Sequence, residues 1–480
     1  MPPRASAAGS TGARTGLVQE RPLRHPDATS PDVMTRRAWW LVLLNFLLPG
    51  SAQVLAGNRR LGRVGLGATL AMWVLIVLAA LLALLWQPAL FTLGSNWFVL
   101  TALQLILAAY VVLWIVLTVD TLRLVRLVRV RGRARLGVAL LAVVLLVVSG
   151  GTASYAAYSV GTTRGTLGSI FGQSGPSVPP SEGYYNILLL GADSGDGRDS
   201  MRFDSISVVS VNAETGATTI TGIPRDIQNP PFSAGPMQDL YPDGFEGHSD
   251  ATCGWSAGIN QLMNAVEVCR DGSGLYPDAA SKGSTPAVEA TKDAAEGILG
   301  IDIPYYVFVD MHGFADMIDA LGGVDITVTE RLPKGGGPTY DGQPAEEWAI
   351  GWIEPGPQRM DGDTAQWYAR SRYTTSDWDR MQRQRQLQQA MLEQLDPMTV
   401  LTRFNEIAAA GQDLIETDLP QSLLPYFAEL ALKAKEQPMT TLELTPQGIG
   451  IDPDDPDYER VHEAVQQALH PPAPTPAPEG

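Results

Sequence analysis

The stretches YYNILLLGAD (residues 184–193) and DSISVVSVNAETGATTITGIPRD (residues 204–226) decide the fold of the polar part of this chain. The first is a continuous apolar run that ends in Gly-Ala-Asp, which is typical of a buried strand leading into a loop at Asp193. The second alternates β-branched and small polar residues on both sides of the turn sequence Glu-Thr-Gly. This pattern predicts a hairpin that ends at Arg225 and Asp226.

Helices and strands alternate in the residues that follow. Residues 285–300 (TPAVEATKDAAEGILG) have helical spacing, 305–310 (YYVFVD) predict a strand, 311–323 (MHGFADMIDALGG) a capped helix and 324–330 (VDITVTE) another strand. Helix is expected to dominate from Asp361 to about Leu432. This alternation favours the α/β class.

The part of the chain before this domain is apolar. Residues 67–86, 97–119 and 137–158 are uncharged and each about long enough to cross a hydrocarbon core. The loop between the second and third segments carries six arginines, whereas the loop between the first and second has no charge. The positive-inside rule therefore predicts three membrane spans, a cytoplasmic N-terminus and an extracytoplasmic domain after about residue 160.

The apolar stretch at residues 39–57 contains Asn, Pro, Gly and Gln and is flanked by basic residues. We expect it to be interfacial or re-entrant, since a fourth span would move the N-terminus outside. The predicted organisation is, in order, a disordered cytoplasmic arm, a membrane domain, a linker, an extracytoplasmic domain and a disordered tail: residues 1–34, 35–160, 161–182, 183–470 and 471–480.

The two parts of the chain carry opposite charge. Residues 1–160 hold 15 arginines and four acidic residues, whereas the remainder holds 19 basic and 47 acidic residues, a net charge of −28. A domain that acidic should repel nucleic acid, whose affinity for proteins comes largely from phosphate neutralisation. The two cysteines, Cys253 and Cys269, lie in the acidic part. The sequence does not decide between a disulfide that joins them and two buried free thiols.

Arginines cluster late in the acidic part. Six of its 19 basic residues lie between residues 359 and 385. On a helix over residues 377–395, Arg380, Arg383 and Gln384 are spaced i, i+3 and i+4 and project from one face. Because the planar guanidinium matches phosphate oxygens, this face is a candidate phosphate site. The alternative is a solvated face that pairs with Asp377 and Asp379.

Two further groups support a phosphate site. Arg370 and Arg372, in YARSR, alternate as a short extended segment would, presenting two guanidiniums to one ligand. Carboxylates at predicted strand ends, where open α/β sheets commonly bind ligands, could hold Mg²⁺. The alternative is that the carboxylates at the strand ends are ordinary aspartates in turns.

At this point the residues carry a resemblance. In order and spacing, NILLLGAD, RFDSISVVSVN, GIPRD, YYVFVDMHGFADMIDALGGVDITV, GPQRMDGDTAQWYARSR and SDWDRMQRQRQ resemble the motifs of the LytR-CpsA-Psr family over roughly residues 184–395. The resemblance implies a bacterial plasma-membrane protein with a three-layer α/β/α domain around a central mixed sheet. It also implies a long apolar pocket for a polyprenyl chain, and transfer of a glycopolymer from a polyprenyl-pyrophosphate carrier to peptidoglycan.

The family's site residues are carried over by matching motif. The resemblance implies that Asp193 and Asp204 bind the metal, and that the pyrophosphate is bound by the following residues: Arg225, Arg370, Arg372, Arg380, Arg383 and Gln384. Asp226 supports the site, and either Asp204 or Asp226 takes the proton of the attacking hydroxyl. A hydrolase using water and a non-catalytic regulator that binds polyprenyl phosphates are the alternatives.

The sequence also departs from the family pattern. Gly258 stands where a lysine is common, and an insertion that contains His248 and both cysteines surrounds it. His248 is interpreted as a surface residue of this loop. The departure leaves the acceptor and the polymer open, and the three predicted spans exceed the single helix that the family implies.

Overall fold

The structure is a computed structural model that describes most of the chain: residues 23–24, 26–171, 177–192, 202–371, 373–394, 403, 406–407 and 415–471. Asp193 and Arg372 lie outside the described residues. The chain forms two compact units. One comprises Met1–Leu81 with Ala102–Tyr158, and the other comprises Leu82–Thr101 with Ser159–Gly480.

The apolar part of the chain is helical. Among the described residues, three helices are long and apolar enough to cross a membrane, and they cover the three predicted segments except for Trp86, which follows the first helix. The elements of this part are α1 (Pro31–Leu47), α2 (Ser51–Ala56), α3 (Arg59–Leu85), α4 (Gln87–Ser95), α5 (Trp97–Val125), η1 (Leu127–Arg129) and α6 (Gly132–Phe171).

Residues 39–57 do not form one continuous helix. The chain breaks after α1, where Pro49 cannot donate a hydrogen bond and Gly50 takes φ +95°, a conformation that favours glycine. A Cβ at Gly50 would also lie 2.6 Å from the carbonyl oxygen of Gly62. At the other end of this part, α6 continues to Phe171, so residues 161–171 are helical rather than linker as predicted.

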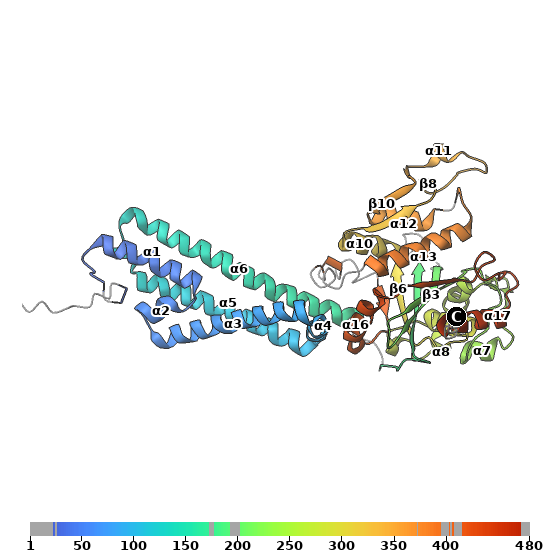
Figure 1. Cartoon of the computed structure of the whole chain (residues 1–480), viewed down its shortest axis with the longest axis horizontal. Coiled ribbons are helices and arrows are strands. Elements are labelled where there is room, and N and C mark those ends of the chain that lie inside the picture. Colours follow the sequence, from blue (N-terminus) through green and yellow to red (C-terminus); the bar gives the residue numbers. More distant parts are fainter. Residues whose placement is uncertain are drawn as a thin grey trace, which may run out of the picture. The chain divides into compact units, whose positions relative to one another are not determined.

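The polar domain is built on a mixed six-stranded sheet of order β11-β6-β1-β2-β3-β12. Its strands β6 and β3 are labelled in Figure 1. β1 is parallel to β6 and β3 is parallel to β12, while β2 runs antiparallel to both of its neighbours. The strands of this sheet are β1 (Tyr184–Ala192), β2 (Phe203–Asn212), β3 (Thr218–Ile223), β6 (Tyr305–Asp310), β11 (Ile415–Thr417) and β12 (Thr440–Glu443).

The predicted hairpin is formed by β2 and β3, and local contacts explain its turn. The Oδ1 atom of Asn212 accepts hydrogen bonds from the backbone N–H groups of Glu214 and Thr215, both at 3.0 Å. Gly216 follows at φ +75°, and a Cβ there would lie 2.8 Å from the carbonyl oxygen of Leu430. Only glycine fits this turn, so the sequence Glu-Thr-Gly sets the register of the pair.

Helices cover both faces of the sheet, as expected for an α/β/α domain. Alternate residues of β1 point to opposite faces. Leu188 and Leu190 pack in a buried core with side chains of α9 and α17, whereas Ile187 and Leu189 face a cavity bounded by α10, α13 and α16. These helices are α9 (Pro286–Leu299), α10 (Met311–Leu321), α13 (Asp377–Gln394), α16 (Leu424–Ala434) and α17 (Tyr458–Leu469).

The region predicted to be mostly helix from Asp361 is interrupted, because Ser371 and Tyr373–Ser376 are not helical and β11 lies within it. A second small sheet packs against α12 and α13 in its own buried cluster. Its elements and the short hairpin between them are β7 (Val324–Val328), β8 (Leu332–Lys334), α11 (Ala345–Trp348), β9 (Gly351–Ile353), β10 (Gly356–Met360) and α12 (Gly362–Arg370).

The remaining elements are short and lie between β3 and α9, or just before α16. They are α7 (Pro236–Leu240), β4 (His248–Ser249), β5 (Gly254–Trp255), η2 (Ile259–Gln261), η3 (Asn264–Val268), α8 (Gly272–Leu275), η4 (Ala280–Lys282) and η5 (Gln421–Leu423).

Candidate active site

The direction of the strands brings Asp204 and Arg225 to one edge of the sheet. β1, β3 and β6 end at this edge and the antiparallel β2 begins there. Ser205 pairs with Gly191 and Phe203 pairs with Ala192, so Asp204 is the extra residue of a β-bulge. Bulges of this kind re-aim a side chain and are common beside active sites.

Arg225 links the two predicted carboxylates. Its Nη1 donates to Oδ1 of Asp204 at 2.6 Å, and its Nε lies 3.3 Å from Oδ2 of Asp226. Burial disfavours the charge of Arg225, but the hydrogen bond to Asp204 and the charges of Asp226 and Asp377 outweigh it and raise the pKa. The guanidinium is therefore held in place and fully charged.

Arg380 places a second positive charge beside Arg225. Its Nη2 donates to Oδ2 of Asp377 at 3.1 Å, and its buried Nε has no hydrogen-bond partner among the described residues. Burial lowers the pKa of Arg380, and the charge of Arg225 acts in the same direction. Two adjacent guanidiniums, one with an unused donor, favour an anionic ligand.

The alternative of a solvated helix face is only partly correct. The pair between Arg380 and Asp377 exists, but the side chain of Arg380 is only 7% exposed. Asp379 instead accepts hydrogen bonds from the backbone N–H and the hydroxyl of Ser376. The arginine face of α13 is thus turned into the domain rather than toward water.

Arg383 differs from Arg380 although both lie on the same helix face. Its Nε donates to the carbonyl oxygen of Tyr368 at 3.1 Å, and its Nη2 donates to the carbonyl oxygen of Ser371 and to Oγ1 of Thr375. The remaining Nη1 lies 3.6 Å from Oε1 of Glu330. Arg383 therefore holds the end of α12 against α13, and its N–H groups are occupied by acceptors of the protein itself.

The predicted extended arrangement of Arg370 and Arg372 is wrong for the first of them. Arg370 is the last residue of α12, and its guanidinium lies 5.5 Å from the ring centroid of Trp367. The apolar–polar period of the preceding residues extends the helix to this point, and Ser371 is its C-terminal cap.

Three residues at this edge were not predicted from the sequence. Nδ2 of Asn260, in η2, donates to Oδ1 of Asp226 at 2.9 Å. Asp452 and Asp454 line a cavity of about 450 Å³ with Arg225, Asp226, Asp377 and Trp378. Because β12 is parallel to β3, the acidic segment after β12 reaches the same edge. Its Asp-Pro-Asp-Asp-Pro-Asp composition was the available signal.

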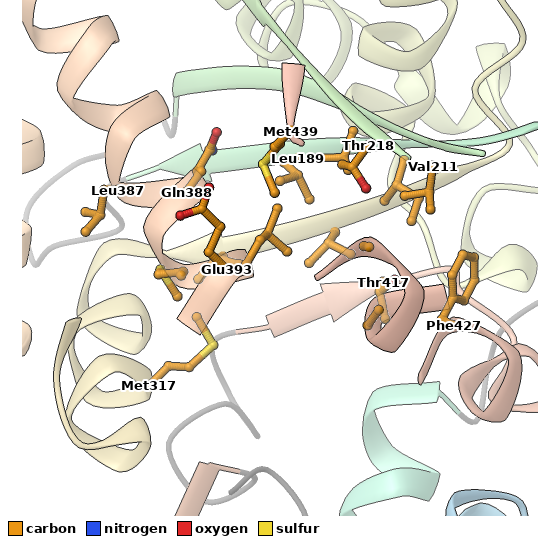
Figure 2. Close-up of a pocket in the computed structure, with 18 of the residues that line it drawn as sticks. Leu189, Val211, Thr218, Met317, Leu387, Gln388, Glu393, Thr417, Phe427 and Met439 are labelled. Atoms are coloured by element: carbon orange, nitrogen blue, oxygen red, sulfur yellow. The ribbon is translucent and has the colours of Figure 1, made fainter. Parts of the chain in front are cut away.

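A large apolar cavity lies on the face of the sheet that carries α13. Its volume is about 780 Å³, within the range of small-molecule sites, and it is bounded by strands β1, β2 and β6 and by α10, α13 and α16. Figure 2 shows Leu189 and Val211 from the sheet, Met317 from α10 and Phe427 from α16 directed into this space.

Two residues that line the apolar cavity are neighbours of arginine-site residues in the chain. Ser205 lines the cavity and directly follows Asp204 in the chain. Gln384 also lines it and lies one helical turn after Arg380, while its Nε2 donates to the carbonyl oxygen of Ala369 at 3.4 Å. One ligand with an anionic head and a long apolar tail suits this combination.

The described residues contain no group of three or more His, Cys, Asp or Glu side chains arranged to hold a metal ion. Of the two predicted metal ligands only Asp204 is described, at the bulge beside the end of β1. Mg²⁺ commonly takes one or two protein carboxylates and completes its shell with phosphate oxygens and water. Asp204, with a side chain 28% exposed at the arginine site, fits such a partial set.

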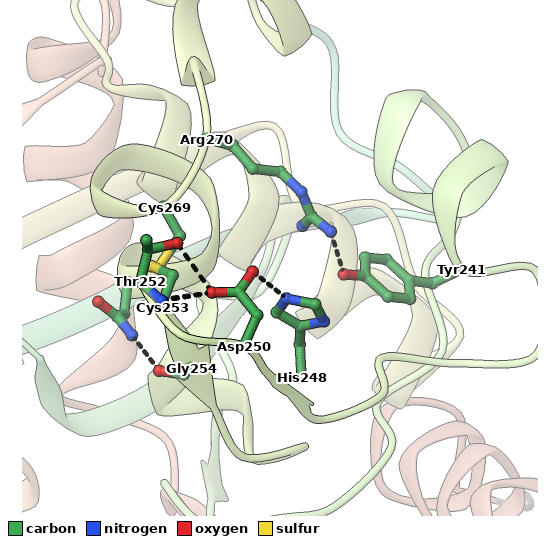
Figure 3. Close-up of a disulfide and its surroundings, with 9 residues drawn as sticks. Tyr241, His248, Asp250, Thr252, Cys253, Gly254, Cys269 and Arg270 are labelled. Carbon is green, nitrogen blue, oxygen red and sulfur yellow. Dashed lines mark hydrogen bonds and ion pairs between the residues drawn. A yellow bond between two sulfur atoms is a disulfide. The ribbon is translucent and has the colours of Figure 1, made fainter.

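The insertion forms a compact loop stapled by a disulfide between Cys253 and Cys269 (Figure 3). The guanidinium of Arg270 lies 4.8 Å from the ring centroid of Trp255, and its Nη2 donates to the hydroxyl of Tyr241 at 2.6 Å. His248 is about half exposed and pairs with Asp250. The closed loop between the cysteines also contains Asn260, which contacts Asp226.

The domain is similar to a known protein family and to curated relatives. The profile of the LytR_cpsA_psr family matches residues 164–240 and 257–468, which leaves out most of the insertion. Biofilm regulatory protein A of Streptococcus mutans is 25% identical over 285 residues, which cover 58% of this chain and 61% of that protein. The chain thus spans about three fifths of the length of this relative.

A second relative is the polyisoprenyl-teichoic acid–peptidoglycan teichoic acid transferase TagU of Bacillus cereus. It is 27% identical over 288 residues, which cover 58% of this chain and 76% of that protein. Among solved structures, TagV of B. subtilis has a TM-score of 0.39 at 22% identity, covering 60% of this chain and 98% of that one. TagT bound to LIIa-WTA has a TM-score of 0.39 at 18% identity, covering 62% and 94%.

The profile match covers more than half of the chain and contains every described residue of the arginine site. It rests on two separate segments in the order that the motifs predict. The chain therefore belongs to the LytR-CpsA-Psr family.

Proposed function

We propose that this protein transfers a glycopolymer from a polyprenyl-pyrophosphate carrier to a hydroxyl group of peptidoglycan. The observation that carries the proposal is that Ser205 and Gln384, which line the apolar cavity, lie directly after Asp204 and one helical turn after Arg380 of the arginine site. A pyrophosphate would lie against Arg225 and Arg380, and the polyprenyl chain would fill the cavity. The names of relatives such as TagU support the same class of reaction.

In the proposed reaction the acceptor hydroxyl attacks the phosphorus that is bonded to the glycopolymer. A new phosphorus–oxygen bond forms to the acceptor, and the bond to the bridging oxygen breaks, which releases polyprenyl phosphate. Arg225 and Arg380 stabilise the charge that develops on the leaving phosphate. Arg370, Arg372 and Gln384 are proposed as further pyrophosphate contacts, and Arg383 acts by holding α12 and α13 together.

Asp226 is the better placed of the two candidate bases. Its side chain is 59% exposed, compared with 28% for Asp204, whose Oδ1 is held at 2.6 Å by Arg225. The amide of Asn260 fixes Oδ1 of Asp226 at 2.9 Å, as an orienting residue does for a general base. Asp226 would accept the proton of the attacking hydroxyl.

A divalent cation, Mg²⁺ or similar, is proposed at Asp204 and Asp193. When bound it would neutralise the phosphate oxygens as the charge on the leaving group grows. Asp204 would supply one carboxylate ligand of that site, and Arg225 would keep this carboxylate oriented.

The membrane arrangement is part of the proposal. The apolar helices suggest a membrane anchor. The arginine-rich loop between α5 and α6 favours three spans with the N-terminus in the cytoplasm and the domain outside. That placement would give the site access to both the lipid carrier and the cell wall.

The test is transfer in vitro. Full-length protein in liposomes is given a lipid-linked glycopolymer, peptidoglycan and Mg²⁺, and polymer bonded to peptidoglycan is measured. We expect Arg225→Gln to lower the rate by at least ~10²-fold, as loss of a preorganised donor does. Arg359→Gln is the matched control, because Arg359 belongs to the same sequence cluster but pairs with Asp325 on the small sheet.

Two results would contradict the proposal. Release of polyprenyl phosphate at the same rate with and without peptidoglycan would indicate a hydrolase. Binding of the lipid with no metal-dependent turnover, and no loss of wall-linked polymer in an Asp226→Asn strain, would indicate a non-catalytic regulator.

A further inference from the structure

Between β7 and β10 the chain makes an excursion, residues 330–355, that the proposed reaction does not use. Its base is anchored, since Leu332 and Ile353 are buried with β7 and α12. Lys334 Nζ also lies 3.1 Å from Oδ2 of Asp363 in α12. In Figure 1, β8 and α11 stand at the outer end of this layer of the domain.

Two aromatic side chains, Trp348 and Tyr373, meet at the tip, and Tyr340 is hydrogen-bonded to Glu347, the residue before Trp348; we call these three side chains the aromatic platform. The rings of Trp348 and Tyr373 meet edge to face with centroids 5.0 Å apart. The Tyr373 hydroxyl donates to the carbonyl oxygen of Gly336 at 2.8 Å, and the Tyr340 hydroxyl donates to Oε2 of Glu347 at 3.1 Å. Tyr340 is nevertheless 57% exposed and Tyr373 45% exposed.

The ring of Tyr373 is held against the backbone although it is exposed. Gly337 has φ +99°, and a Cβ there would lie 2.1 Å from Cζ of Tyr373, so the ring lies directly on the backbone. A ligand that packs on these rings would not have to order them first, which removes part of the usual cost of binding. Exposed aromatic side chains held in this way are typical of recognition surfaces.

The charge of the tip selects the kind of ligand. Residues 335–350 contain Asp341, Glu346 and Glu347, all exposed, and no lysine or arginine. Such a surface repels phosphate-bearing polymers, which would need basic partners. It suits an uncharged sugar chain, because the C–H faces of sugar rings pack on aromatic rings and sugar hydroxyls donate hydrogen bonds to carboxylates.

The platform is connected to the arginine site through one short segment. Ser371 and Thr375, on either side of Tyr373, both accept hydrogen bonds from Arg383 of α13. Tyr373 and Asp377 are four residues apart, so their Cα atoms are separated by at most ~14 Å. A glycan that lies on the platform can therefore extend to the reacting phosphate.

We propose that the aromatic platform binds the uncharged sugar chain of the acceptor, separately from the anionic donor at the arginines. This inference rests on the proposed function and adds to it a named acceptor surface.

The experiment uses full-length protein in nanodiscs and two probes of equal length, a neutral tetramer of N-acetylglucosamine and an anionic tetramer of glycerol phosphate. Saturation-transfer NMR measures the binding of each. We expect the neutral tetramer to bind at the platform, whereas any binding of the anionic tetramer, at the arginine site, should be the same in the platform variant as in the original protein. The double variant Tyr340→Ala/Trp348→Ala should bind the neutral tetramer at least tenfold more weakly.

Val268→Ala, which truncates an exposed apolar side chain of the insertion, is the control and should leave binding unchanged. Binding of the polyprenyl pyrophosphate is measured in every variant and should not change, which also reports that the domain is folded. Absence of neutral-tetramer binding, an equal loss of both tetramers in the double variant, or undiminished binding of the neutral tetramer by that variant would overturn the inference. Neutral-glycan binding without transfer would instead count against the proposed function.

Discussion

The substitution Arg380→Gln is expected to weaken binding of a polyprenyl pyrophosphate while the fold survives. Arg380 makes one ion pair, with Asp377 at 3.1 Å, and its Nε has no hydrogen-bond partner among the described residues. The adjacent charge of Arg225 already acts against it. Removing this guanidinium therefore takes away little that the protein uses for its own stability.

The magnitudes follow from these contacts. Asp377 is 35% exposed and can be solvated when its partner is gone, while the burial of the Arg380 charge itself costs free energy in the folded state, so the free energy of unfolding should change by only about 1 kcal/mol. A hydrogen bond to a charged phosphate is worth about 3 kcal/mol, which corresponds to roughly a 100-fold loss of affinity.

Arg383→Gln, on the same helix face, should lower the stability of the fold while the folded protein keeps its affinity for the polyprenyl pyrophosphate. Its guanidinium donates to the carbonyl oxygens of Tyr368 and Ser371 and to the hydroxyl of Thr375. Glutamine cannot replace all of these bonds, and buried acceptors would be left without donors. We expect a loss of about 3 kcal/mol or more in the free energy of unfolding.

The assay compares two quantities in the same preparations of full-length protein. Thermal unfolding in detergent measures stability, and equilibrium binding of a fluorescent polyprenyl pyrophosphate at a temperature well below unfolding measures affinity. A stable Arg383→Gln protein that has lost the lipid, or an Arg380→Gln protein that binds normally, would refute the division of roles derived from these contacts.

Three further predictions concern other parts of the domain. Burial raises the pKa of Asp293 to about 6, so the folded state holds this proton more tightly than the unfolded chain and stability should fall as pH rises from about 4 to about 6. Asp293→Asn, which keeps an acceptor for Tyr276, should reduce this pH dependence of the thermal midpoint, whereas the exposed-site control Asp239→Asn should leave it unchanged. Met317→Trp, at the wall of the apolar cavity, should weaken binding of a long polyprenyl pyrophosphate at least tenfold but not that of a short-chain analogue, and equal losses for both would argue against this cavity as the site of the tail. Chelation of divalent cations should stop transfer and added Mg²⁺ restore it, with Asp204→Asn needing more Mg²⁺ for half-maximal rate; transfer at an unchanged rate in chelator would exclude the metal.

Local patterns were sufficient for the main elements of the fold. The apolar runs identified the long helices, the continuous run before Asp193 predicted β1, and the turn around Gly216 predicted the hairpin of β2 and β3. Each of these depends on neighbours within a few residues. The linker and the segment around Arg370 were mispredicted because helices continue through residues whose local preference is weak when tertiary contacts support them.

The sequence by itself determined that arginines cluster on one face of α13, that carboxylates follow the strands, and that the motifs belong to one family. Only the tertiary structure decided which arginine is available to a ligand. Arg380 and Arg383 lie on the same face of α13, but the guanidinium of Arg383 lies against the carbonyl groups at the end of α12. The contacts of Asn260 with Asp226, the β-bulge at Asp204 and the apolar cavity are likewise made by segments far apart in the chain. Sequence periodicity shows which face of a helix or strand a side chain occupies. The free energy of a charged side chain depends instead on the groups that the tertiary structure packs against that face.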